Sequence, residues 1–336
     1  MRKKKVVLFA VLCLLCSAIL FFGAGVGGEG GAMALTSSGE PLVVLVAGLD
    51  EAAGNTDVMM LVSLDPGRHE ITVLQLPRDT YFDAPTPQGK LNQLYPTYRA
   101  RGLGSDDALL ALSSELSTTF DLAIDHFVAV DISAVSQLVD ELGGVTVDLP
   151  APIGYREGET YIELPAGKRT LTGEEAVRFI RFRSGYVEGD LGRVDAQKLL
   201  LMASYHKVKD ELSFSTLASV LPRIYSQIST DMPLSEQIAY VYSFWRDRSE
   251  YSVRLMTLPG EAVRADGDAG LWYYVVNRAA AAEVLSRYFG SGAAFDAAKR
   301  LVDDGRDSFS NIYYDKAYSY SVYTEDTIDE LRVKTK

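Results

Sequence analysis

The amino-acid sequence predicts an α/β protein, a three-layer α-β-α sandwich around a central mixed β-sheet, with a transmembrane helix near the N-terminus. Strand-like and helix-like patterns alternate along the chain from residue 41 onward. The first strand pattern, Leu42–Ala47, is apolar without interruption, which is typical of a strand buried on both faces. Residues 6–26 carry no charge and form a run long enough to span a bilayer.

The first residues predict a membrane anchor. Residues 1–5 include four consecutive cations, which favour retention of the N-terminus in the cytoplasm and place the rest of the chain outside. A cleaved signal peptide ending near Ala32–Ala34 is the alternative, but the apolar run of 6–26 is long for such a signal. Residues 27–40 are rich in Gly, Ala and Ser and predict a flexible linker. We therefore expect a single-pass cell-membrane protein.

The exported part is acidic and contains no cysteine. Without the first five residues it carries 29 Lys and Arg against 45 Asp and Glu, a formal net charge of -16. Such a charge disfavours nucleic-acid binding. Both cysteines, Cys13 and Cys16, lie in the apolar run, so disulfides and zinc–thiolate sites are excluded from the exported domain.

A β-hairpin follows the first strand and brings acidic and basic side chains together. Val58–Ser63 and Glu70–Leu76 read as its two strands, joined by an Asp-Pro-Gly-Arg turn. Folding about this turn places Asp57 opposite Arg78, and Asp50 reaches the same end from the preceding strand. The alternative is a simple cross-strand ion pair of Asp57 with Arg78, which leaves Asp50 unexplained.

Helix and strand patterns continue to residue 303, and no linker divides them, so residues 41–303 are predicted to form one domain. The three histidines are scattered, and His126 on an alternating strand is interpreted as structural. The expected elements are a helix Asp106–Phe120, a strand Asp125–Val130, a helix Ile132–Leu142, a strand Val145–Leu149, helices Leu212–Tyr225 and Leu234–Trp245, a strand Tyr251–Pro259, and a segment Leu271–Val276 leading into a helix Arg278–Phe289.

Residues 177–197 gather arginines in this acidic protein. A Thr-Gly-Glu-Glu capping box predicts a short helix from Gly173 to about Ile180, after which Arg181 and Arg183 would share one face of an extended segment. Asp190 is predicted to cap a long helix, on which Arg193 and Gln197 lie in one stripe with it.

Arginine offers a planar fork of donors that matches phosphate or carboxylate oxygens, so this stretch predicts an anion-binding cleft. The alternative is a surface belt of salt bridges with Glu174, Glu188 and Asp195. The final residues, 304–336, form a Tyr-rich tail that reads equally as a strand, a glycan-facing surface or a mobile segment.

A series of short motifs in this order resembles the LytR-CpsA-Psr family over about 160 residues, from 42 to 202. The motifs are Gly48-Leu-Asp50, Asn55-Thr-Asp57, Leu76-Pro-Arg78-Asp79-Thr80, Lys90-Leu-Asn92, Leu138-Val-Asp-Glu-Leu-Gly-Gly144, Leu171-Thr-Gly-Glu-Glu-Ala176, Arg181-x-Arg183 and Gly189-Asp190 with Arg193 and Gln197. The resemblance implies a phosphotransferase that attaches an anionic or capsular glycopolymer from a polyprenyl-pyrophosphate carrier to peptidoglycan through a phosphodiester bond.

The resemblance also implies roles for individual residues. Its magnesium-binding aspartates fall on Asp50 and Asp57, with Mn²⁺ as the alternative ion. The residues expected to grip the donor pyrophosphate are Arg78, Arg181, Arg183 and Arg193, with Gln197 and Asn92 as further substrate contacts. Asp79, next to Arg78, is the candidate base for the acceptor hydroxyl.

One position departs from the family pattern. Many members have an arginine where this chain has Asn55, which removes one expected phosphate contact. Two other activities therefore stay open at this point: hydrolysis of the polyprenyl pyrophosphate, and a non-catalytic protein that binds envelope glycans or regulates wall stress.

Overall fold

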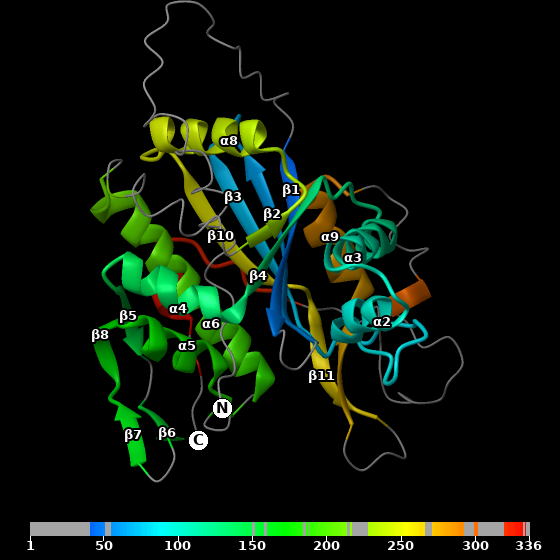
Figure 1. Cartoon of the computed structure of the whole chain (residues 1–336), viewed down its shortest axis with the longest axis horizontal. Helices are drawn as coiled ribbons and strands as arrows, with labels where there is room; N and C mark the ends of the chain where they lie inside the picture. The colour runs from blue at the N-terminus through cyan, green and yellow to red at the C-terminus, as the bar shows by residue number, and fades with distance from the viewer. Residues whose placement is uncertain are drawn as a thin grey trace, which may run out of the picture.

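The computed structural model describes residues 41–50, 55–149, 152–157, 160–183, 186–187, 189–213, 216, 228–265, 271–291, 299–301, 319–331 and 333. At its centre is a mixed sheet of six strands in the order β10-β3-β2-β1-β4-β9 (Figure 1). These strands are β1 (Leu42–Asp50), β2 (Asn55–Asp65), β3 (Glu70–Leu76), β4 (His126–Asp131), β9 (Ile228–Thr230) and β10 (Ser252–Thr257). β1 runs parallel to β4 and β3 parallel to β10, whereas the other neighbours are antiparallel.

Both faces of the sheet are buried under helices, as the uninterrupted apolar strand predicted. Val44 and Val46 of β1 belong to one core cluster, and Val43 and Leu45 belong to the other. Successive strand residues point to opposite faces, so the two clusters are the two sides of the sheet. The first cluster includes residues of α4 (Ile132–Glu141), α5 (Gly173–Arg181), α6 (Asp190–His206) and α8 (Leu234–Asp247), and the second those of α2 (Leu94–Ala100), α3 (Ser105–Phe120) and α9 (Arg278–Phe289). The predicted mixed sheet with helices on both faces is confirmed (Figure 1).

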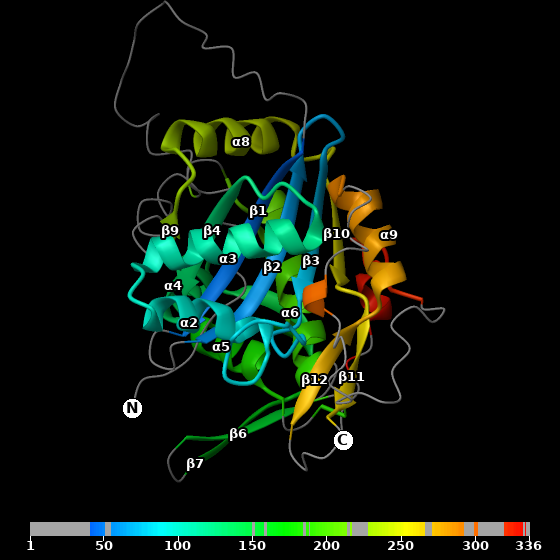
Figure 2. The same cartoon turned by 90° about the vertical axis from the view of Figure 1, so that its right-hand side faces the viewer.

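Three small antiparallel pairs lie outside the central sheet (Figures 1 and 2). They are β5 (Val145–Leu149) with β8 (Gly167–Leu171), β6 (Ile153–Glu157) with β7 (Thr160–Leu164), and β11 (Gly260–Arg264) with β12 (Trp272–Val276). The short helical turns are Leu91–Gln93, Lys207–Glu211, Lys299–Leu301 and Ile328–Glu330. The strand predicted at Val145–Leu149 is present, but it pairs with β8 and takes no part in the central sheet.

Some expectations fall on residues that the structure does not describe. The predicted anchor over 6–26, the linker over 27–40 and most of the helix expected at Leu212–Tyr225 lie outside the described residues. Within the part that is described, none of the helices combines the length and the apolar character needed to cross a bilayer.

Candidate active site

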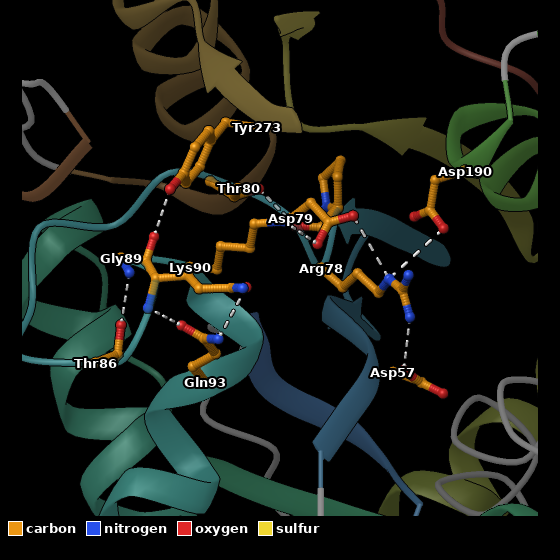
Figure 3. Close-up of polar contacts among 12 residues, drawn as sticks. Asp57, Arg78, Asp79, Thr80, Thr86, Gly89, Lys90, Gln93, Asp190 and Tyr273 are labelled. Carbon is orange, nitrogen blue, oxygen red and sulfur yellow. Dashed lines mark hydrogen bonds and ion pairs between the residues drawn. The ribbon is translucent and has the colours of Figure 1, made fainter. Parts of the chain in front are cut away.

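The β2–β3 hairpin brings Asp57 and Arg78 into contact. Gly48 of β1 pairs with Val58 but its neighbour Leu49 pairs with Thr56, so Asp57 is the extra residue of a β-bulge. A bulge re-aims the side chain of its extra residue. Arg78 follows the end of β3, and its Nη1 donates a hydrogen bond of 2.9 Å to Asp57 Oδ1 (Figure 3). The predicted meeting of these two side chains is confirmed.

Arg78 lies between two further carboxylates (Figure 3). Its Nε is 3.7 Å from Asp79 Oδ2 and 3.5 Å from Asp190 Oδ1, and only 19% of the side chain is exposed. Burial on its own lowers the pKa of Arg78, but the neighbouring Asp190, Asp79 and Asp57 outweigh it, so the pKa is raised. Arg78 is therefore a cation held at the centre of three acids.

Helix α6 supplies Asp190 and a second buried arginine. Arg193 Nη2 donates to Asp190 Oδ2 at 2.9 Å, and only 7% of the Arg193 side chain is exposed. Burial lowers the pKa of Arg193, because removing the guanidinium from water disfavours its charged form, and Asp190 restores only part of this loss. Asp190 thus bridges the arginine of its own helix and the arginine that follows β3.

The expected cap of this helix is wrong by one residue. Gly189 is the N-cap and Asp190 is the first helical residue, with no side-chain capping bond at the cap position. Gly189 has a φ of 55°, a left-handed conformation that glycine adopts without strain. The Asp190 carboxylate lies against the arginines instead.

The two arginines of the Arg181-x-Arg183 motif lie in different backbone conformations, Arg181 in a helix and Arg183 in the segment after it. The capping box of Thr172 and Glu175 starts α5 as predicted, but the helix continues through Arg181. The Phe182 N–H still bonds to the Arg178 carbonyl, and only then does the chain become extended. Arg183 is 54% exposed, and its Nη1 lies 3.9 Å from Asp190 Oδ1. The structure therefore brings Arg183 to the Asp190 cluster, while Arg181 ends the helix as a half-buried residue.

The alternative from the sequence was a surface belt of salt bridges, in which the arginines of residues 177–197 would pair with Glu174, Glu188 and Asp195. Glu174 pairs with Arg178, and Asp195 pairs with Lys198 at 2.8 Å, while Glu188 lies outside the described residues. By contrast, Arg78, Arg183 and Arg193 all approach the one carboxylate of Asp190. This arrangement is a cluster of cations around one acid.

Gln197 and Asn92 support the cluster. Gln197 is 4% exposed, donates to the Ile180 carbonyl at 3.4 Å, and accepts from Gln75 Nε2 at 3.3 Å. Asn92 donates its backbone N–H to the Arg78 carbonyl at 3.2 Å, which ties the loop after β3 to the following segment. Both residues are thus buried beside the cluster, and Gln197 links α6 to β3.

Several buried polar atoms around the cluster have no hydrogen-bond partner among the described residues. They are Arg78 Nε, Asn92 Oδ1, Tyr186 Oη, Asp190 Oδ1 and Arg193 Nε. Buried polar groups in proteins are normally satisfied, so a group of such atoms indicates a place where a polar ligand binds. The set includes two guanidinium donors, which suit an anion.

Two residues of this region had no role in the sequence-based site. Lys90 Nζ lies 3.0 Å from Asp79 Oδ1 and 5.2 Å from the centre of the Tyr273 ring (Figure 3). Gln75 contacts Gln197 from inside β3. The sequence contained a hint of both residues. Lys90 is the first residue of the Lys90-Leu-Asn92 motif, and Gln75 is a polar residue near the end of an otherwise apolar strand. Asp79, the candidate base, is consequently held between Lys90 and Arg78.

The predicted metal pair is only half described. Asp50 ends β1 and its backbone pairs with that of Asn55, but the side chains of both lie outside the described part of the structure. Asp57 is 17% exposed at the cluster. Among the described residues, no three His, Cys, Asp or Glu side chains are grouped so that they could hold a metal ion. The metal role of Asp50 and Asp57 stays a prediction.

Comparison with known proteins gives a consistent result. The model of the LytR_cpsA_psr family matches residues 28–289. A relative from Oceanobacillus iheyensis, named polyisoprenyl-teichoic acid–peptidoglycan teichoic acid transferase TagU, is 28% identical over 241 residues, which cover 70% of this chain and 71% of the relative. The protein of the same name from Halalkalibacterium halodurans is 26% identical over 254 residues, covering 71% and 75%.

Solved structures share the fold. The crystal structure of B. subtilis TagV has a TM-score of 0.61 and 21% identity, covering 76% of this chain and 99% of TagV. A structure of TagT described as bound to LIIa-WTA has a TM-score of 0.54 and 22% identity, covering 75% of this chain and 91% of TagT.

Proposed function

The chain belongs to the LytR_cpsA_psr family, and from this membership and the arginine cluster we propose that it attaches an anionic or capsular glycopolymer, carried on a polyprenyl pyrophosphate, to peptidoglycan. The names of its relatives support both the carrier and the acceptor. The observation in this chain that carries the proposal is the convergence of Arg78, Arg183 and Arg193 on the carboxylate of Asp190.

A pyrophosphate suits this cluster on charge and on geometry. It carries several negative charges, and the buried Nε atoms of Arg78 and Arg193 make no hydrogen bond among the described residues, so both can donate to phosphate oxygens. Phosphoryl transfer requires alignment and charge stabilisation more than covalent help from the protein. Preorganised arginines stabilise the charge that develops on the phosphorus oxygens in the transition state.

The proposed reaction forms one bond and breaks one. The acceptor hydroxyl oxygen of peptidoglycan attacks the phosphorus that bears the glycan, and the bond from that phosphorus to the bridging oxygen breaks. The carrier leaves as a polyprenyl monophosphate, and the glycan becomes attached through a phosphodiester. Asp79, which lies 3.7 Å from Arg78 Nε and 3.0 Å from Lys90 Nζ, is the proposed acceptor of the hydroxyl proton.

Asp50 and Asp57 are the proposed ligands of Mg²⁺, with Mn²⁺ as the alternative. Mg²⁺ is commonly held by one or two carboxylates together with substrate phosphate oxygens. Asp57 supports this proposal, because its hard carboxylate oxygen lies 2.9 Å from Arg78, where the pyrophosphate is proposed to bind. When bound, the ion would neutralise part of the pyrophosphate charge.

A membrane location is proposed from the sequence. The basic residues 1–5 and the apolar run 6–26 support a single-pass anchor with the domain on the extracellular side. Such an anchor would hold the domain beside a lipid-linked donor. Protease added to intact cells is expected to digest the domain, and complete protection would contradict this orientation.

A reconstituted reaction tests the proposed function. The purified full-length chain is incubated with a glycan linked to polyprenyl pyrophosphate, with peptidoglycan and with Mg²⁺. We expect glycan bound to peptidoglycan and an equal amount of polyprenyl monophosphate. Release of the monophosphate with the glycan phosphate free in solution would identify a hydrolase instead, and binding without turnover would identify a non-catalytic protein.

A further inference from the structure

A segment near the C-terminus, beyond the family match, is built into the fold. The family model ends at residue 289, yet residues 319–331 are described and pack against the sheet edge. Tyr323 and Leu255 of β10 exchange two backbone hydrogen bonds, of 2.8 and 2.9 Å. Lys209 Nζ lies 3.0 Å from Glu325 Oε2. Residues 319–325, at the red end of the colour scale in Figure 1, are thus fixed beside β10.

This segment forms one wall of a cleft of about 240 Å³. The other walls come from α6 and from the β10–β12 region. Its polar and aromatic lining includes Asp195, Lys198, Tyr274, Tyr320, Ser321 and Tyr323. Drug-sized ligands occupy pockets of roughly 300–1,000 Å³, so this cleft suits a smaller unit.

The cleft adjoins the arginine cluster. Leu191, which lines the cleft, directly follows Asp190 on α6. On the opposite wall, the backbone N–H of Tyr274 donates to the carbonyl of Asp79 at 2.9 Å. One wall of the cleft therefore begins one residue from Asp190, and the opposite wall contains Tyr274, whose backbone is bonded to that of Asp79.

The charges in the cleft compensate each other. Lys198 is almost fully buried, and its Nζ lies 2.8 Å from Asp195 Oδ1 and 5.5 Å from the centre of the Tyr323 ring. The Asp195 side chain is 22% exposed. A cleft with a paired cation has no excess positive charge for another phosphate, whereas a partly exposed carboxylate can accept hydrogen bonds from neutral hydroxyl groups.

We propose that this cleft is a subsite for one neutral sugar ring of the substrates. A tyrosine ring can stack its flat apolar face on the C–H surface of a sugar, and tyrosines line this cleft, while Asp195 and Ser321 offer polar partners for the sugar hydroxyls. The inference rests on the proposed function, because in that function both the donor and the acceptor contain sugars. The sugar is either part of the peptidoglycan acceptor or the part of the donor glycan next to its phosphate.

Two variants of the full-length protein test the subsite. Asp195→Asn keeps a hydrogen-bond acceptor for Lys198 but removes the charge that sugar hydroxyls would use. Tyr320→Leu removes a ring and keeps an apolar side chain. This second variant keeps the test valid if Asp195→Asn fails to fold. We expect the KM for one substrate to rise by about tenfold in each, with kcat nearly unchanged. Asp107→Asn, an exposed change on α3 across the sheet, is the matched control.

Both substrates are varied in the kinetics, and sugar contact is measured separately by saturation-transfer NMR with soluble peptidoglycan strands and with carrier-free donor glycan. A higher KM for peptidoglycan assigns the acceptor as the source, and a higher KM for the donor assigns the donor glycan. Unchanged KM values and unchanged NMR contacts in both variants would overturn the proposal. Should the wild-type protein bind these saccharides through Asp195 and Tyr320 without transferring them, the subsite stands and the proposed function fails.

Discussion

Asp190 explains how a protein with a net charge of -12 keeps three arginines in one place. Its two carboxylate oxygens lie 2.9 Å from Arg193, 3.5 Å from Arg78 and 3.9 Å from Arg183. Asp57 and Asp79 also lie at Arg78, and Lys90 pairs with Asp79, so the cluster holds four cations against three acids and retains one formal positive charge for an anionic ligand. At the scale of single residues, the proposed activity depends on this imbalance.

Arg183→Ala is expected to reduce transfer by about a hundredfold or more, the usual effect of removing one donor to a developing anion. The change should leave folding nearly intact, within about 0.5 kcal/mol, because the side chain is 54% exposed and its ion pair is long. Transfer kinetics and urea unfolding check the two parts. Arg68→Ala, at the far end of the hairpin and 73% exposed, is the control, and equal activity in both variants would remove Arg183 from the site.

Arg193→Lys is expected to make transfer sensitive to alkaline pH. Burial already lowers the pKa of Arg193, and an ordinary lysine starts from a pKa of about 10.4, which the same burial would lower further. The substituted lysine should therefore lose its charge at a lower pH than an ordinary lysine does, while the wild-type arginine stays charged. The pH profile of kcat/KM measures this, and parallel profiles for the two proteins would show that the charge at this position is not used.

Asp57→Asn tests the proposed metal ligand. Asparagine keeps an oxygen that accepts the hydrogen bond from Arg78, now 2.9 Å long, but removes the charge that favours Mg²⁺. We expect lower transfer and no response of the remaining activity to added Mg²⁺, whereas chelation should inactivate the wild-type protein. Wild-type activity that persists after chelation would contradict the metal role.

At the scale of elements, α6 is the part that sets the geometry of the site. Its first turn carries Asp190 and Arg193, and its buried Gln197 reaches β3 through Gln75. Gly192 in the same turn packs closely against Tyr186, where an added Cβ would lie 2.6 Å from the Tyr186 Cβ. This contact leaves no room for a larger residue at the start of the helix.

Gly192→Ala is therefore expected to displace the start of α6. The clash involves atoms near the Tyr186 backbone, which cannot move aside easily, and such overpacking typically costs about 1–3 kcal/mol. Transfer should fall as well, because Asp190 and Arg193 move with the helix. Urea unfolding measures the stability change. Gly104→Ala, where the added Cβ would meet only the Asp107 side chain, is the control and should cost less.

The elements differ in how clearly the sequence signals them. The hairpin of β2 and β3 was predictable because a typical turn sequence, Asp-Pro-Gly-Arg, separates two apolar strands. The capping box likewise located the start of α5. By contrast, β6, β7 and β8 are five-residue strands of mixed polarity, and their pairing depends on contacts that no local pattern reveals. The cap at Gly189 was missed because an aspartate follows it, and aspartate is itself a strong cap residue.

At the scale of the whole molecule, the site joins segments distant in sequence. The cluster combines the end of β3 with α6, and the adjoining cleft adds residues 319–323. The sequence motifs indicated Arg78, Arg183 and Arg193, because a family resemblance can assign residues that are far apart in the sequence to one site. The family resemblance gave no role to Lys90. The sequence also left three interpretations of the tyrosine-rich tail open, because the pairing of Tyr323 with β10 depends on the folded sheet.

Binding of a short polyprenyl diphosphate, such as geranyl diphosphate, tests whether the arginine cluster holds a pyrophosphate. Isothermal titration of the full-length protein with Mg²⁺ would compare the wild type with Arg78→Ala and with the control Arg68→Ala. The Kd is expected to rise by about tenfold or more in Arg78→Ala, because a charge-assisted contact is lost, and to stay unchanged in Arg68→Ala. Equal affinities in all three proteins would show that the arginine cluster does not bind the diphosphate.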